Sequence, residues 1–300
     1  MWIIFPILII IGIIVIKKNN SKENEIAKIV EAADSNDPTA KEKLSKYFDD
    51  GLTSEKYNEI RKSVYLPKAN SGDSNAQYMM GLLSSKNRGE MEKWWTKAAE
   101  NGNTDAMYSL SASYSFDIDE PLGLGVNEEK SRYWLEKAAE TNPDAMCALG
   151  LQYSIEGKAD EALELYLKAS KLAEGKIKLK ALTRVAREYG DLLFKGHDSE
   201  KEREFLLKAL NVKPCPNDSI HSFGEEYADS AFWLESWYKI KYKDSREQGD
   251  LKNAAYCAVI EATWDSDKSD RLNNYVGVYT QQECNKWVED ARSFNFRLPY

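Results

Sequence analysis

Residues 94–100 read WWTKAAE, and nearly the same phrase returns at residues 133–140 as YWLEKAAE. Lys97 lies 40 residues before Lys137. Self-similarity at a fixed offset is typical of a stacked repeat architecture. A unit of this length has room for two short helices and two turns but not for a core of its own, so the units must stack to fold.

A second pattern precedes each phrase. Ala106, Leu110 and Tyr114 are echoed by Ala145, Leu149 and Tyr153. Residues spaced by four lie on one narrow stripe of a helix, so this stripe is predicted to be a packing face. The same template fits, with substitutions, from three further alanines: Ala40, Ala76 and Ala181.

The second helix of each unit is predicted to carry a large residue followed at the third and fourth positions by Lys-Ala. The large residues are Tyr65, Trp94, Trp134, Leu165 and Phe205. Five units are therefore expected between about residues 36 and 212. Trp94 and Trp134 hold equivalent places in successive units, so both are expected to pack in the core.

These residues resemble the Sel-1-like repeat, a short relative of the tetratricopeptide repeat. The turns at 70–76 and 101–106 reproduce the closing turn of that family, with Gly72 and Gly102 where a helix end needs a positive φ. The resemblance implies an all-α, right-handed α-solenoid of helix-turn-helix units that binds proteins. The stretch 117–127 is similar to a loop of the same family, so Gly123 and Gly125 are not interpreted as a phosphate-binding loop.

The first sixteen residues carry no charge and are followed at once by Lys17 and Lys18. At about 1.5 Å per residue this run is about 24 Å long, short for a bilayer but sufficient with flanking lysines at the interface. The sequence therefore predicts a transmembrane helix over 1–18, in the membrane through residues 2–16, and a linker over 19–35.

Cations on the C-terminal side of this run place the repeats in the cytoplasm by the positive-inside rule. The predicted location is thus the bacterial inner membrane, crossed once, and a periplasmic repeat domain is the alternative. The four cysteines are too few and too unevenly spaced for a disulfide framework. The lysine-rich, arginine-poor usage suggests an AT-rich bacterial genome.

A net charge of −8 argues against nucleic acid as a partner, because a phosphate binder needs a basic stripe. Two histidines, His197 and His221, lie at no metal-binding spacing from each other or from a cysteine. The acid pairs at 49–50 and 225–226 are expected on exposed faces. No enzyme activity, metal or cofactor is predicted.

The region 213–300 begins with two prolines that stop any helix, Pro214 and Pro216. Helices are predicted over 219–241 and 246–264, and a third from Thr280, where Thr280 and Glu283 have the form of a capping box. The region holds half of the eight tryptophans. A helical cap over the last repeat is one interpretation, and a partner-binding module using surface Trp and Tyr is the other.

The predicted function is a non-enzymatic protein-interaction scaffold tethered to the membrane. Side chains on the first helix of each unit, opposite the packing stripe, would face the partner, and these include Tyr78, Tyr108 and Arg187. Contact with the adjacent unit is the alternative for the two tyrosines. An immunity protein that neutralises a secreted antibacterial toxin and an enzyme with an unrecognised site are the competing functions.

Overall fold

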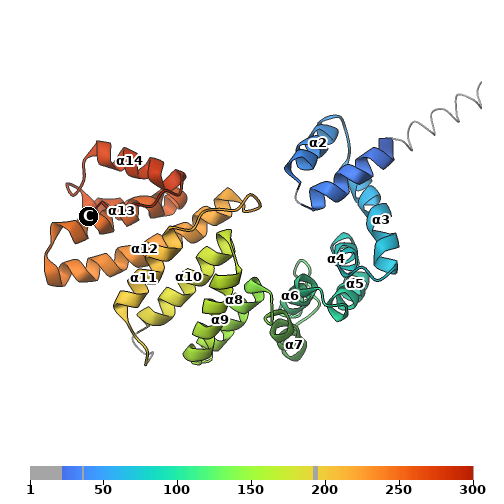
Figure 1. Cartoon of the computed structure of the whole chain (residues 1–300), viewed down its shortest axis with the longest axis horizontal. Coiled ribbons are helices and arrows are strands. Elements are labelled where there is room, and N and C mark those ends of the chain that lie inside the picture. The colour runs from blue at the N-terminus through green and yellow to red at the C-terminus, as the bar shows by residue number, and fades with distance from the viewer. Residues whose placement is uncertain (1–21, 36, 192–194, 300) are drawn as a thin grey trace, which may run out of the picture. The chain divides into compact units, whose positions relative to one another are not determined.

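The computed structural model describes residues 22–35, 37–191 and 195–299, and these residues form helices without any strand. The chain divides into two compact units, Met1–Lys137 and Ala138–Tyr300 (Figure 1). Each unit has hydrophobic clusters of its own.

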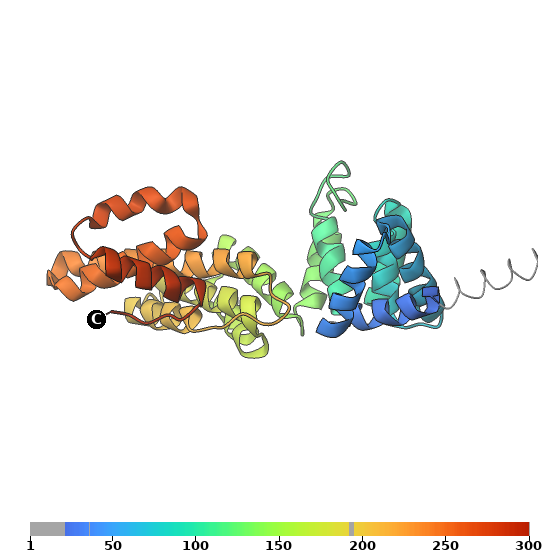
Figure 2. The ribbon, with the colours of Figure 1, turned by 90° about the horizontal axis from the view of Figure 1, so that it is seen from above.

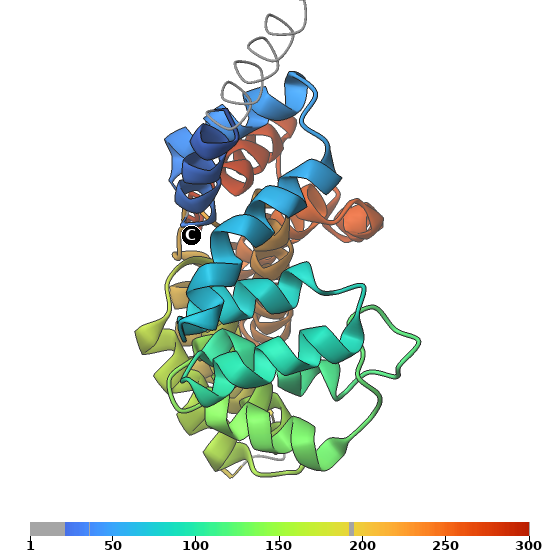
Figure 3. The ribbon, with the colours of Figure 1, turned by 90° about the vertical axis from the view of Figure 1, so that its right-hand side faces the viewer.

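In the first unit, successive helices lie one beside the next, as Figure 3 shows for the blue and cyan part of the chain. After a helix over residues 22–34, its helices are α2 (Pro38–Asp49), α3 (Ser54–Asn70), α4 (Ser74–Leu83), α5 (Arg88–Glu100), α6 (Thr104–Ser113) and α7 (Glu128–Ala138).

The second unit continues with helix pairs and ends in longer helices. Its helices are α8 (Pro143–Ile155), α9 (Ala159–Leu172), α10 (Gly175–Gly190), α11 (Ser199–Leu210), α12 (Ile220–Ser245), α13 (Gln248–Trp264), the 3-10 helix η1 (Ser266–Tyr275) and α14 (Gln281–Arg292). All helices from α2 to α11 lie within the range 36–212 that the sequence assigned to repeats.

The first helices α2, α4, α6 and α8 each start at an Asn or Asp that caps them, whereas the side chain of Glu174 makes no cap bond to α10. The Asn103 side chain accepts a hydrogen bond from the backbone N–H of Ala106 at 2.8 Å, and Asp73 and Asn142 do the same for the matching alanines. Gly72 and Gly102 have φ of 98° and 85°, which confirms the predicted helix-ending turns. Turn and cap together fix where each pair begins.

A large side chain of the second helix packs directly on the backbone of the first. A Cβ atom added to Gly81 of α4 would lie 2.2 Å from Trp95 Cδ1 of α5, and one on Gly150 of α8 would lie 2.7 Å from Tyr166 Cε1 of α9. Trp95 also donates its indole N–H to the carbonyl of Tyr78 at 3.3 Å. Glycine therefore sets how closely the two helices of a pair approach.

The expectation that Trp94 and Trp134 are the core residues is wrong by one position. Trp95 is only 1% exposed and Leu135 2%, whereas Trp94 and Trp134 are half-buried. The buried stripe of α5 runs through Met91, Trp95 and Ala98, so Trp94 lies at its edge, where Lys97 covers the ring at 5.0 Å.

The predicted linker over 19–35 also differs from the structure, because residues 22–34 are helical. Ile26, Val30 and Ala33 recur at helical spacing and pack against Ala40 and Leu44 of α2. The anchor predicted over 1–18 falls outside the described residues. Among the helices that are described, none has the length and apolar character required to span a bilayer.

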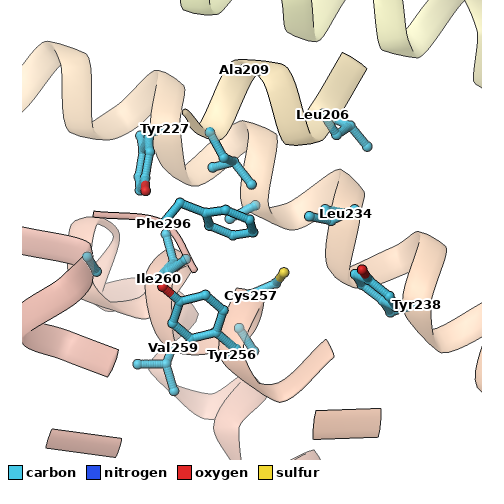
Figure 4. Close-up of a cluster of buried hydrophobic side chains, with 14 of the residues drawn as sticks. Leu206, Ala209, Tyr227, Leu234, Tyr238, Tyr256, Cys257, Val259, Ile260 and Phe296 are labelled. Atoms are coloured by element: carbon cyan, nitrogen blue, oxygen red, sulfur yellow. The ribbon is translucent and has the colours of Figure 1, made fainter. Parts of the chain in front are cut away.

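The C-terminal helices enclose the largest hydrophobic cluster, part of which Figure 4 shows between α11, α12 and α13. The predicted capping box is present: Thr280 Oγ1 accepts from the N–H of Glu283, and Glu283 accepts from the N–H of Thr280. Trp237 and Trp287 are buried, as expected of a cap.

A charged network holds η1 onto this cap. Arg271 of η1 contacts the buried carboxylates of Glu235 at 2.5 Å and Glu261 at 2.9 Å, and the Tyr275 hydroxyl donates to Glu235 at 2.5 Å. Because a buried carboxylate requires a partner, this network fixes the path of the chain after α13.

The register of the repeat core can be tested by replacing each of the two adjacent tryptophans. Trp95→Ala should lower the free energy of unfolding by about 4 kcal/mol, because it empties a closed site against Gly81. Trp94→Ala should cost about 1 kcal/mol. Urea denaturation of both variants measures the difference, and equal losses would contradict the observed register.

Candidate partner-binding site

The two tyrosines predicted to face a partner are half-buried between first helices of the first unit. The Tyr78 ring on α4 stacks on Trp95, with ring centroids 6.2 Å apart. Its hydroxyl lies 3.3 Å from Ser109 Oγ on α6. Tyr108, also on α6, is half-buried as well. For Tyr78, the contacts are those of packing against the next helix pair.

Arg187, the third predicted residue, is exposed on α10 and borders a cavity of about 280 Å³. The cavity lies on the first helices α8 and α10 together with α11 and α12. It is lined by Leu151, Ser154, Arg184, Arg187, Glu188, Gly190, Asp191, Glu202 and Trp233. We call it the Arg187 cavity.

Trp233 of α12 forms one wall, and no sequence pattern groups it with Arg187. The Arg187 guanidinium lies 4.8 Å from the centre of the Trp233 ring, at cation–π distance. The two residues are separated by 46 positions, so only the packing of α12 against α10 brings them together. The sequence places Trp233 only among the tryptophans of the C-terminal region.

The indole N–H of Trp233 is buried and has no hydrogen-bond acceptor within the described part of the chain. Trp95, Trp237 and Trp264 each donate their indole N–H to a backbone carbonyl. A buried donor without an acceptor costs about 1–3 kcal/mol. Because the atom is closed to solvent, this cost belongs to the fold and the N–H is not a contact that a partner could reach.

The opposite wall of the cavity is acidic. Glu188 is buried, and the Glu202 carboxyl lies so close to Gly190 that a Cβ there would be 2.6 Å from it. Burial raises the pKa of Glu202 above its usual range, and the charge of His197 partly opposes this shift. The cavity thus presents two arginines, an aromatic face and carboxylates, a combination common at protein-binding hot spots.

The two histidines lie away from any cluster that could bind a metal. His221 is exposed, with Nε2 3.4 Å from Glu225 of the same helix, and His197 is exposed in the chain before α11. Over the ranges that the structure describes, no group of His, Cys, Asp and Glu could hold a metal ion. Glu226 differs from the expected exposed acid: it is half-buried, and burial raises its pKa.

The Sel1 repeat model matches residues 74–103, 104–141 and 143–173, which are the helix pairs α4–α5, α6–α7 and α8–α9. The middle of the chain thus matches three consecutive Sel1 repeats. The Arg187 cavity begins on α8, in the last of these repeats, and continues onto the helices that follow. A comparison with curated proteins finds no match.

Among solved structures, the chain is similar to a protective antigen present in uropathogenic Escherichia coli strains, which displays an SLR fold. The TM-score is 0.60 at 18% sequence identity, over 90% of this chain and 55% of the antigen. The chain thus spans about half the length of that protein. This likeness concerns the fold alone and, with the helix pairs, is consistent with an α-solenoid.

The acidic wall gives the Arg187 cavity a testable pH dependence. The pKa of Glu202 is raised in the folded protein, so folding favours the protonated carboxyl. The stability that this protonated carboxyl contributes at low pH is lost as pH rises through the folded-state pKa. The variant Glu202→Gln carries no such charge, so it should gain stability relative to wild type from about pH 4 to about pH 7. Urea denaturation at both pH values measures this, with Glu200→Gln as the exposed control on the same helix. A relative stability that does not change with pH would exclude the effect.

Proposed function

We propose that this chain is a non-enzymatic scaffold that binds a protein partner through the Arg187 cavity. Sel1 repeats support the general class, because repeats of paired helices build extended surfaces for other proteins. The observation that carries the proposal is the exposed guanidinium of Arg187, which lies over the indole ring of Trp233 at the edge of the cavity. Trp and Arg are enriched at binding hot spots, so this pair would be the centre of the interface.

The charges of the cavity suggest the kind of contact. Arg187 is exposed and would meet an acidic side chain or a carbonyl oxygen of the partner, while Glu188 and Glu202 would favour a cation on the opposite side. Neighbouring charges of both signs fix the orientation of a bound segment more strongly than they raise its affinity. We infer that the partner presents a polar segment with alternating charge.

We further propose that residues 2–16 tether the scaffold to the bacterial inner membrane, with the repeats on the cytoplasmic side. The support is the uncharged run itself and the lysines that follow it, Lys17 and Lys18. A tether would hold the Arg187 cavity near the membrane and raise its effective concentration toward partners there.

Arg187→Glu should reduce capture of the partner at least about tenfold, and more at low salt, because it reverses the charge and removes the cation over Trp233. The full chain would be used for affinity purification from native host cells, with captured proteins quantified by mass spectrometry. Arg292→Glu, on the exposed face of α14, is the matched control.

Trp233→Phe tests the same site without changing its charge. It keeps an aromatic ring but weakens the cation–π contact with Arg187, because indole is the stronger partner for a cation, so folding should be retained while capture falls. Equal capture by Arg187→Glu and wild type would refute the site. A chain that captures nothing yet hydrolyses a generic ester, phosphate or glycoside would refute the scaffold itself.

The tether predicts that the full chain sediments with membranes and resists extraction at alkaline pH, whereas a chain lacking residues 1–18 becomes soluble. In spheroplasts, added protease should leave the repeats intact, and replacing Lys17 and Lys18 by Glu should weaken this protection. Digestion of the wild-type repeats in intact spheroplasts would place them on the other side of the membrane.

A further inference from the structure

The loop between α6 and α7, residues 114–127, exposes four large apolar side chains within eleven residues. The exposed fractions are 50% for Phe116, 55% for Ile118, 40% for Leu122 and 59% for Val126. Figures 2 and 3 show this green loop projecting from the first unit. Single exposed apolar residues are ordinary, but a group of four on one projection marks an interaction site.

The loop is held in one shape by its own backbone. Leu124 N–H donates to Ser113 O at 2.9 Å, and Asn127 N–H donates to Tyr114 O at 2.8 Å. Gly123 has no room for a side chain, because a Cβ there would lie 1.9 Å from Asp117 O. Leu122 has φ of 63°, which a bulky residue adopts only when its surroundings impose it. The apolar side chains are therefore presented on a preorganised support.

The loop is also acidic. Asp117, Asp119 and Glu120 are exposed among the apolar residues, and residues 114–127 contain no Lys or Arg. Because the charged side chains of the loop are all negative, an anionic membrane surface would repel it. The complementary surface must instead be apolar with a positively charged rim.

A groove of this character lies in the second unit, between α10, α11 and the chain that follows α11. It encloses about 880 Å³. Its apolar lining residues are Leu182, Leu207, Val212, Pro214 and Pro216. Its cations are Lys178, Arg203, Lys208 and Lys213, against only two acids, Glu174 and Glu204. A local excess of two positive charges stands out in a chain whose net charge is −8.

We propose that the α6–α7 loop of one copy docks into the α10–α11 groove of a second copy. Apolar side chains flanked by three carboxylates would enter an apolar groove whose lining holds four cations and two acids, so that polarity and net charge agree at one contact. Loop and groove are different surfaces of the chain. The contact is therefore heterologous, and its repetition gives a ring or an open row of copies.

This contact is separate from the partner-binding function proposed above. The Arg187 cavity shares none of its lining residues with the α10–α11 groove. A row of copies would display many Arg187 cavities at once, which would strengthen binding to a clustered partner.

Reciprocal charge reversal tests the contact. The full chain is studied by sedimentation equilibrium in a density-matched nonionic detergent over a range of protein concentrations. Wild type should associate beyond the monomer as concentration rises. Asp117→Lys with Asp119→Lys in the loop, or Lys178→Glu with Lys208→Glu in the groove, should each weaken association at least about tenfold at low salt.

A mixture of the two reversed variants should associate again, because each then meets a surface of opposite charge. Asp49→Lys with Asp50→Lys, two exposed acids in the first unit, is the control and should behave as wild type. Arg187→Glu should leave self-association unchanged, which separates this result from a failure of the proposed partner site.

A wild-type chain that stays monomeric up to concentrations on the order of 100 μM would overturn the proposal. So would association that neither reversed pair weakens, or loss in both variants without recovery in the mixture. A loop that instead captures a different protein while the chain stays monomeric would assign this surface to that partner and equally overturn the second-copy contact.

Discussion

The structure depends on the close approach of two helices at a glycine within a pair. Trp95 on Gly81 and Tyr166 on Gly150 place a large ring directly against helix backbone, where any added side-chain atom would collide. Dispersion and burial at this contact bring the helices close enough to act as one layer. Neighbouring pairs within each unit stack on layers of this kind, so the exposed faces of the first helices are positioned by it.

The C-terminal region combines the roles of cap and site. Most of its aromatic side chains are buried with the cluster around α12 and α13, which keeps the last repeat helices covered. Trp233 is only partly buried: it packs against this cluster and also lies under the Arg187 guanidinium of α10. The same helix therefore closes the hydrophobic core and completes the Arg187 cavity.

Charge is distributed unevenly in a chain that is acidic as a whole. The α10–α11 groove is basic, the α6–α7 loop is acidic, and the Arg187 cavity holds both signs. Charged surfaces of this kind steer the encounter with a partner and fix the orientation in which it binds, while burial of apolar side chains supplies most of the affinity. The pH-sensitive carboxyl of Glu202 lies in the cavity of mixed sign, where burial acts against its charge.

The sequence by itself determined the helical units, their glycine turns and the capping box at Thr280, because each depends on residues close to one another along the chain. It identified Arg187 but not Trp233, since their contact arises only when α12 packs on α10. It placed Trp94 in the core where the structure buries Trp95: adjacent residues differ by about 100° around a helix, and only the backbone they meet decides which is buried. Tertiary structure made that choice because Gly81 leaves space for one ring, and Trp95 fills it.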